Sequence, residues 1–145
     1  AGRTLNLPLP VGSGDAEFAA VFERVVEPAV AAFSPQLILV SAGFDAHAAD
    51  PLGDLACSAP GFAQLCHRVR RLADEHADGR LVLNLEGGYD PPALEACVGA
   101  CLTALAANEA RFEPAPSPDS GIVSTSVQAL CEAARAQFGL RANTV

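Results

Sequence analysis

The chain has 145 residues, half of them apolar, which suits one domain or a large part of one with its own hydrophobic core. Its formal net charge is -8 and all nine basic residues are arginine, so we expect no direct nucleic-acid partner, because phosphate binding needs clustered Lys and Arg. No apolar run reaches the roughly 20 residues that span a bilayer, and no cleavable leader is visible, so we expect no membrane partner and a cytoplasmic protein.

The first predicted elements lead to a buried strand. Residues 5–10 form an apolar segment whose prolines restrict it to an edge strand or an extended entry. Apolar residues then recur at spacings of three and four from residue 16 to 33, which predicts an amphipathic helix capped by Asp15 or Ser13. The aliphatic run at residues 37–40 is typical of a strand buried on both faces of a parallel sheet.

The same alternation continues to the end of the chain. A long loop rich in Gly, Asp and Pro follows at residues 41–57, and loops of this length tend to be functional in compact domains. The later predicted elements are a helix from Ser58 or Pro60 to Gly79, a buried strand at 81–85, a diglycine turn, a helix from Pro91 or Pro92 to about Ala107, a Pro-rich linker at 113–118 and a short helix at 127–138.

This order of elements predicts an α/β fold with three layers, in which a parallel sheet carries helices on both faces. We expect residues 1–112 to form this domain, and residues 113–145 to hold the linker and the C-terminal helix. Ligand sites in such sheets lie outside the carboxyl ends of the strands. Residues 43–53 and 86–90 should therefore lie side by side at that edge.

Two strings at the predicted strand ends carry chemistry. Gly43-Phe44-Asp45 places a carboxylate just past a strand, where a metal ligand would lie, although an Asp there is more often a helix cap or turn former. Gly87-Gly88-Tyr89 puts the only tyrosine at the same sheet edge, where a phenol can donate a hydrogen bond to an oxyanion. A lone loop tyrosine is usually a packing residue, but the two glycines make room for a ligand.

The spacing of these strings resembles a known family. VSAGFDA at residues 40–46, DPLG at 50–53 and LEGGY at 85–89 are similar to the class II-like branch of the histone deacetylase and acetylpolyamine amidohydrolase family, which includes bacterial deacetylase-like amidohydrolases. Residues 6–15 look like the segment ahead of these motifs. The resemblance covers roughly residues 5–107 and implies the C-terminal portion of an arginase/deacetylase-like fold.

The resemblance implies a zinc-dependent amide hydrolase acting on acetyl-lysine or acetylpolyamine-type substrates. Asp45 matches the last of three Zn2+ ligands, and Tyr89 matches the catalytic tyrosine that polarises the acetyl carbonyl. Gly87 and Gly88 match the substrate-binding loop that forms one wall of the acyl-lysine tunnel. The family's paired histidines and its Asp-x-His motif lie upstream of the matched region, so the resemblance implies a fragment that is inactive alone and whose parent is the enzyme.

Other features leave alternatives open. Asp45-Ala46-His47 imitates an Asp-x-His motif, but the residues around it identify the other aspartate segment, so His47 is expected to be a loop or rim residue. Cys97 and Cys101 lie four apart on a predicted helix and could pair in a metal site, although small buried residues in a reducing cytosol are commoner. His67 and His76 are expected on a helix surface.

The composition also bears on the origin of the chain. It is rich in Ala, Arg, Gly and Pro and contains no lysine, which is typical of a GC-rich genome and points to a bacterium. It contains no methionine, even at position 1, so we expect a piece of a longer reading frame. The alternative to a deacetylase fragment is a degenerate, non-catalytic α/β module kept for binding or as a scaffold and completed by another polypeptide.

Overall fold

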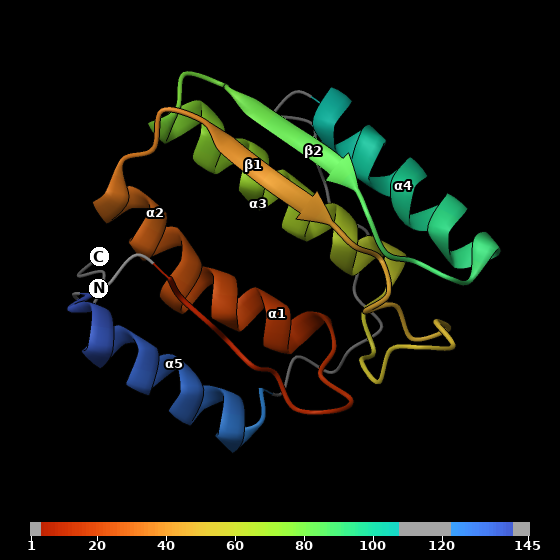
Figure 1. Cartoon of the computed structure of the whole chain (residues 1–145), viewed down its shortest axis with the longest axis horizontal. Helices are drawn as coiled ribbons and strands as arrows, with labels where there is room; N and C mark the ends of the chain where they lie inside the picture. The colour runs from red at the N-terminus through yellow and green to blue at the C-terminus, as the bar shows by residue number, and fades with distance from the viewer. Residues whose placement is uncertain (1–3, 108–122, 141–145) are drawn as a thin grey trace.

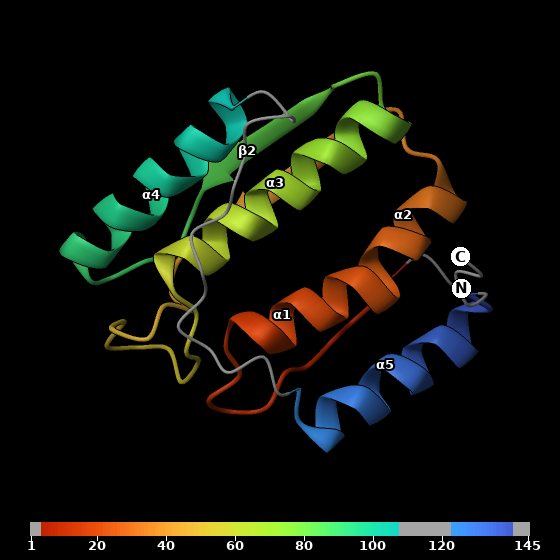
Figure 2. The ribbon, with the colours of Figure 1, turned by 180° about the vertical axis from the view of Figure 1, so that it is seen from behind.

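The computed structural model describes residues 4–107 and 123–140. Its elements are α1 (Asp15–Val21), the π-helical turn η1 (Phe22–Val26), α2 (Glu27–Phe33), β1 (Ile38–Ala42), α3 (Ala59–His76), β2 (Leu81–Leu85), α4 (Pro91–Ala106) and α5 (Thr125–Phe138). Helix α3 lies behind the two strands in Figure 1 and in front of them in Figure 2, with α1 and α2 beside it and α5 on the far side of α1 and α2. None of these helices is long and apolar enough to cross a membrane.

The two strands form a parallel sheet, as the sequence predicts. Ile38 pairs with Leu81 and Ala42 pairs with Leu85, so β1 and β2 begin and end level with each other. The connection between them runs through α3, which is the crossover that joins neighbouring parallel strands. The predicted α/β fold class with a parallel sheet is therefore confirmed. The Pro-rich linker predicted at residues 113–118 lies outside the described residues.

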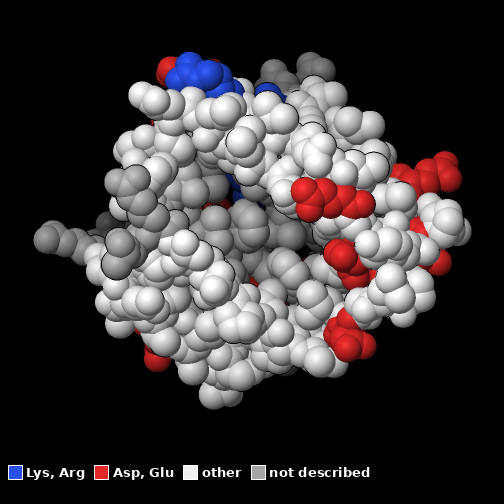
Figure 3. All heavy atoms as spheres, viewed as in Figure 1, with Lys and Arg blue, Asp and Glu red and all other residues white. Residues whose placement is uncertain are grey.

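Only one face of the sheet is covered by the described helices. On the covered face, Ala42 and Leu83 pack against a core built mainly by α3 and α4. On the other face the side chains of Leu39 and Val82, which pair with each other, are 68% and 51% exposed. The prediction that both strands are buried on both faces is wrong for this chain, because its described helices supply one layer and not two. Figure 3 shows mostly uncharged atoms over this open face, with acidic groups gathered at one side.

The first helix begins differently from the prediction. Its N-cap is Gly14, whose backbone N–H donates to the Glu17 carboxylate at 3.1 Å. Asp15 is the first helical residue and is buried, and its carboxylate accepts hydrogen bonds from the backbone N–H of Ser58, at 2.8 Å, and from the Ser58 hydroxyl. The prediction of Asp15 or Ser13 as the cap is wrong, because the Asp15 side chain ties α1 to the start of α3 instead.

The predicted long amphipathic helix is continuous from α1 to α2, but it widens into η1 in the middle. Pro28 follows this turn and has no N–H to donate to the carbonyl of Arg24, four residues earlier, which gives a physical reason for the irregular winding. The Arg24 carbonyl accepts a hydrogen bond from the Arg135 side chain of α5. Helix α5 also buries Val127 and Cys131 against Val25, so it is fixed to this irregular turn.

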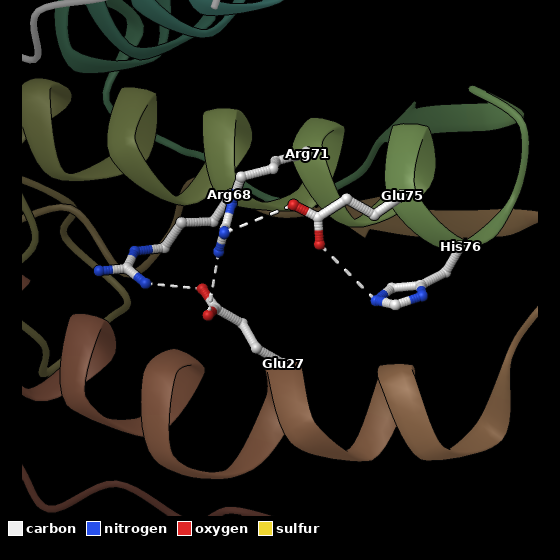
Figure 4. Close-up of polar contacts among 5 residues, drawn as sticks. All are labelled: Glu27, Arg68, Arg71, Glu75 and His76. Atoms are coloured by element: carbon white, nitrogen blue, oxygen red, sulfur yellow. Dashed lines mark hydrogen bonds and ion pairs between the residues drawn. The ribbon is translucent and has the colours of Figure 1, made fainter. Parts of the chain in front are cut away.

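A cluster of charged side chains joins α2 to α3 (Figure 4). The carboxylate of Glu27 lies 2.6 Å from the Arg68 guanidinium and 3.1 Å from that of Arg71. Arg71 also lies 3.5 Å from Glu75, whose other oxygen is 3.7 Å from His76. Because Glu27 is the member on α2 and its side chain is only 17% exposed, it holds the two helices together at this interface.

Candidate active site

The two predicted site segments leave the sheet side by side. Each follows its strand directly, and the level ends of β1 and β2 place both at the same edge. Backbone hydrogen bonds continue beyond the strands, from Glu86 N–H to Ala42 O at 3.0 Å and from Phe44 N–H to Gly87 O at 2.8 Å. The prediction that residues 43–53 and 86–90 meet at the carboxyl edge is confirmed at these contacts.

The side chain of Asp45 is exposed and lies against the diglycine turn. A Cβ atom on Gly87 would lie 2.4 Å from Oδ2 of Asp45, and one on Gly43 would lie 3.0 Å from Oδ1. Glycine at these two positions therefore leaves space for the Asp45 carboxylate. The sequence suggests only that the glycines make room for a ligand, so the structure adds a second reason for Gly87.

Tyr89 follows a glycine that the backbone requires. Gly88 has φ of +130°, which L side chains rarely adopt, and a Cβ there would lie 3.0 Å from the Leu94 side chain and 3.1 Å from Cβ of Phe44. Tyr89 itself is 56% exposed, so it is not a core residue. A phenol in this position is open to a molecule that approaches the sheet edge.

Asp50 connects the two segments, and sequence reasoning assigned it no role. It is only 7% exposed, and its Oδ2 accepts a hydrogen bond from the backbone N–H of Tyr89 at 2.7 Å. Its Oδ1 accepts from Leu52 N–H at 2.9 Å and Gly53 N–H at 3.2 Å. Burial opposes ionisation of Asp50, but these backbone hydrogen bonds, led by Tyr89, hold its pKa below the usual value. The Asp-Pro-Leu-Gly string is a turn signature that could have indicated the bonds within the loop, though not the one to Tyr89.

None of the three histidines is placed with Asp45 or Tyr89 by a hydrogen bond that the described residues show. His47 is half-buried, and its Nδ1 accepts a hydrogen bond from Ala49 N–H at 3.0 Å, which fixes the ring within its own loop. His67 and His76 lie on α3, as predicted, and both are half-buried, so the prediction of surface positions holds only in part. Within residues 4–107 and 123–140, no group of three His, Cys, Asp or Glu residues could hold a metal ion.

The cysteines of α4 belong to the core between α3 and α4. Cys97 is 0% exposed and Cys101 is 8% exposed, which confirms the prediction of small buried residues. Burial, with the Asp15 charge as a smaller contribution, raises the pKa of Cys97 to about 11. A hydrogen bond with Cys66, together with burial, raises the pKa of Cys101. Both thiols are therefore neutral near pH 7, which is the unreactive form.

A cavity of about 480 Å³ lies away from these segments. Its walls come from α2, from the start of β1 and from the end of α5, including Phe33, Leu37 and Phe138, and they include neither Asp45 nor Tyr89. The cavity therefore belongs to the amino end of the strands. A pocket shared by Asp45 and Tyr89 stays a prediction.

Comparison with known proteins gives a consistent result. Residues 1–105 match the family model of the histone deacetylase domain. A probable deacetylase of Archaeoglobus fulgidus is 48% identical over 88 residues, which make up 61% of this chain and 24% of that protein. The histone deacetylase-like amidohydrolase of Pseudomonas aeruginosa is 42% identical over 96 residues, which make up 66% of this chain and 25% of its own length. The solved structure of the histone deacetylase Clr3 has a TM-score of 0.82 at 27% identity, over 97% of this chain and 23% of that one. The chain thus spans about a quarter of the length of these relatives.

Proposed function

Because this chain belongs to the histone deacetylase domain family, we propose that it is the C-terminal part of a zinc-dependent deacetylase. The parent enzyme hydrolyses the amide bond between an acetyl group and an amine, in acetyl-lysine or acetylpolyamine-type substrates. In this proposal Asp45 is a metal ligand, Tyr89 is the catalytic hydrogen-bond donor, and Gly87 and Gly88 bind the acyl chain of the substrate.

One observation carries the proposal. The level ends of the two parallel strands bring the Asp45 loop and the Tyr89 turn together at the carboxyl edge of the sheet, with the Asp45 carboxylate against Gly87. This edge is where ligands bind in α/β sheets. An exposed carboxylate and an exposed phenol on neighbouring segments can both address one small group, such as an acetyl carbonyl.

The chemistry that this chain contributes is electrostatic. As the carbonyl carbon becomes tetrahedral, negative charge develops on its oxygen, and the Tyr89 hydroxyl donates a hydrogen bond to that oxygen. A phenol suits this work because its hydroxyl is a hydrogen-bond donor. The glycine-only wall next to it lets an extended acyl chain approach the backbone closely.

Asp45 fits one position of a zinc shell, since carboxylate oxygen is an accepted zinc ligand and this side chain is exposed at the sheet edge. When bound, zinc supplies a Lewis acid for the carbonyl oxygen and lowers the pKa of a water molecule. Because the described residues hold no group of three possible ligands, the other ligands have to come from outside residues 4–107 and 123–140. In our proposal they come from the rest of the parent.

The decisive experiment is Tyr89→Phe in the intact parent. The hydroxyl bonds most strongly in the transition state, so its loss should raise the barrier by on the order of 3 kcal/mol, or roughly a hundredfold in kcat, with little change in KM. Zinc content and Tm should stay at their unmodified values. Turnover of an acetylated substrate at the unmodified rate would show that Tyr89 is not catalytic.

Asp45→Asn in the parent tests the metal role separately. Activity and zinc content should fall together, and added zinc should restore part of the activity. Asp54→Asn is the matched control, because Asp54 is an exposed carboxylate in the same loop. The chain of 145 residues, purified alone, should show no deacetylase activity and only weak zinc binding. Tight, stoichiometric zinc binding by the chain alone would contradict this part of the proposal.

The open sheet face supports the view that the chain is part of a larger domain. Leu39 and Val82 are aliphatic residues of a kind that normally lies in a core, and here they are exposed on the side of the sheet that the described helices leave bare. The same face suits the alternative, a non-catalytic module completed by another polypeptide. The two differ in the parent, because only the deacetylase loses turnover when Tyr89 is changed to Phe.

A further inference from the structure

The turn that carries Tyr89 has little rigidity of its own. Gly87 and Gly88 have no side chains to pack, and glycine explores more backbone conformations than other residues. Two hydrogen bonds hold this diglycine, one on each side: Phe44 N–H to Gly87 O at 2.8 Å, and Tyr89 N–H to Asp50 Oδ2 at 2.7 Å. The first is a backbone contact that continues the sheet. The second depends on one side chain.

We propose that Asp50 is a positioning residue that fixes the Tyr89 turn against the loop that carries Asp45. This inference deepens the proposed function and rests on it for the role of Tyr89. The bond joins Asp50 to Tyr89, 39 positions later in the chain. It is a side-chain contact that ties the two segments together at the sheet edge.

The two oxygens of Asp50 have separate partners. Oδ1 accepts from Leu52 N–H and Gly53 N–H, which fixes the carboxylate within its own loop, and Oδ2 accepts from Tyr89 N–H. These donors are backbone N–H groups, which a carboxylate can satisfy with both oxygens at once. An amide has one oxygen only, and its NH2 group would face an N–H donor on the other side. The site therefore needs Asp, and Asn is not an equivalent.

The position of the turn matters because the Tyr89 backbone determines where the phenol hydroxyl can lie. A catalytic group displaced by about 1 Å can cost roughly a hundredfold in rate. Asp45 belongs to the same loop as Asp50, and Gly53, whose N–H donates to Asp50, lies against the Asp45 carbonyl, since a Cβ on Gly53 would lie 1.9 Å from that oxygen. We call the contact from the Asp50 carboxylate to Tyr89 N–H the clamp. The clamp fixes the position of the Tyr89 turn relative to the loop that carries the proposed metal ligand.

The first test uses the full chain and needs no enzyme activity. Tyr89 is the only tyrosine and there is no tryptophan, so the intrinsic fluorescence of the chain reports on Tyr89. In the unmodified chain the Tyr89 amide should be protected from hydrogen exchange. In Asp50→Ala it should exchange roughly tenfold to a hundredfold faster, because a hydrogen bond to a charged acceptor is lost. Acrylamide should also quench the tyrosine fluorescence more strongly.

Two further variants make the test specific. Asp54→Ala removes a carboxylate from the same loop and should leave both signals unchanged. Asp50→Asn keeps the side-chain size, so it serves if Asp50→Ala does not fold. Its single oxygen satisfies two donors when it faces Leu52 and Gly53 N–H, which leaves the NH2 group against Tyr89 N–H, so Tyr89 should again exchange faster. An unprotected Tyr89 amide in the unmodified chain would overturn the proposal without any variant. So would unmodified exchange and quenching in a folded Asp50→Asn or Asp50→Ala chain.

The second test separates this inference from the proposed function. In the parent, Asp50→Asn should lower kcat at least about tenfold while KM and zinc content stay near their unmodified values. If zinc content falls as it does in Asp45→Asn, Asp50 acts on the metal side and the clamp on Tyr89 is wrong. If Tyr89→Phe leaves turnover unchanged while Asp50→Asn still frees the Tyr89 amide, the proposed function fails and the clamp stands. If Tyr89→Phe abolishes turnover and Asp50→Asn leaves the Tyr89 amide protected, the clamp fails and the function stands.

Discussion

Replacing Gly87 by alanine should disturb the proposed metal ligand without unfolding the chain. The new Cβ would lie 2.4 Å from Oδ2 and 2.8 Å from Cγ of Asp45, well inside the 3.4 Å at which ordinary contact begins. Gly87 is not among the glycines with positive φ, so its backbone accepts alanine. The overlapping atoms are the end of an exposed side chain, which can rotate away at a cost of about 0.5 to 1.5 kcal/mol.

Gly53→Ala gives the contrast that makes this prediction quantitative. Its Cβ would lie 1.9 Å from the Asp45 carbonyl oxygen, about 1.5 Å short of ordinary contact, and a carbonyl cannot rotate away as a side chain does. The loop backbone itself has to move, which should cost about 1 to 3 kcal/mol or more. Both substitutions add one methyl group next to Asp45. The difference between their free energies of unfolding therefore reports whether the side chain or the backbone of Asp45 has to move.

Urea unfolding of the two variants of this chain measures the difference, because the midpoint shifts with stability when the slope is unchanged. In the parent, Gly87→Ala should lower zinc content while Tm changes little, since the displaced carboxylate no longer lies where the proposed shell needs it. A Gly87→Ala chain as unstable as Gly53→Ala would refute the reasoning about the exposed side chain. Full zinc content in a Gly87→Ala parent would indicate that Asp45 is not a zinc ligand.

Three other predictions concern the rest of the fold. Glu27→Gln should lower the free energy of unfolding, measured with urea, by about 1 to 2 kcal/mol, because it weakens both arginine contacts between α2 and α3. The control Glu23→Gln, at an exposed position, should change the free energy of unfolding little. The free energy of unfolding should fall as pH rises from about 9 to about 11, because the unfolded chain releases the Cys97 proton that the folded chain retains, and Cys97→Ala should reduce this fall. The chain alone should bind the dye ANS through its open sheet face. The double variant Leu39→Thr, Val82→Thr should bind less ANS without a lower Tm. Absence of dye binding by the unmodified chain would contradict an accessible apolar face.

The sequence predicts the sheet and its edge well, because local patterns determine them. Short aliphatic runs at 37–40 and 81–85 flank a helix with a clear stripe, and a strand, helix and strand in this order form a parallel pair. Ser58 as the cap of α3 also follows from local chemistry, since its side chain accepts from Gly61 N–H. Once the strands pair in register, the meeting of the Asp45 and Tyr89 segments is a geometric consequence.

What the sequence does not predict depends on contacts between distant residues. Asp15 looks like a helix cap in sequence, but its partner Ser58 lies 43 positions away and takes up its carboxylate. Asp50 looks like a turn former, and its bond to Tyr89 spans 39 positions. The open sheet face escapes prediction for a different reason: an aliphatic run indicates a strand that can be buried on both faces, and it does not say whether the same chain supplies both covers.

The direct contacts between the Asp45 segment and the Tyr89 segment lie within one strand–helix–strand unit and the turn after it, residues 38–90. The strand register, the Phe44–Gly87 bond and the Asp50–Tyr89 bond involve no residue outside that range. The relative position of the two proposed site residues is therefore built into this part of the fold, whatever packs on the open face of the sheet. If the proposed function is right, the rest of the parent does not need to arrange these two residues. It has to supply the remaining zinc ligands, a general base and the cover for the sheet, and the separate loss of zinc content and of turnover in the Asp45 and Tyr89 variants follows from that division.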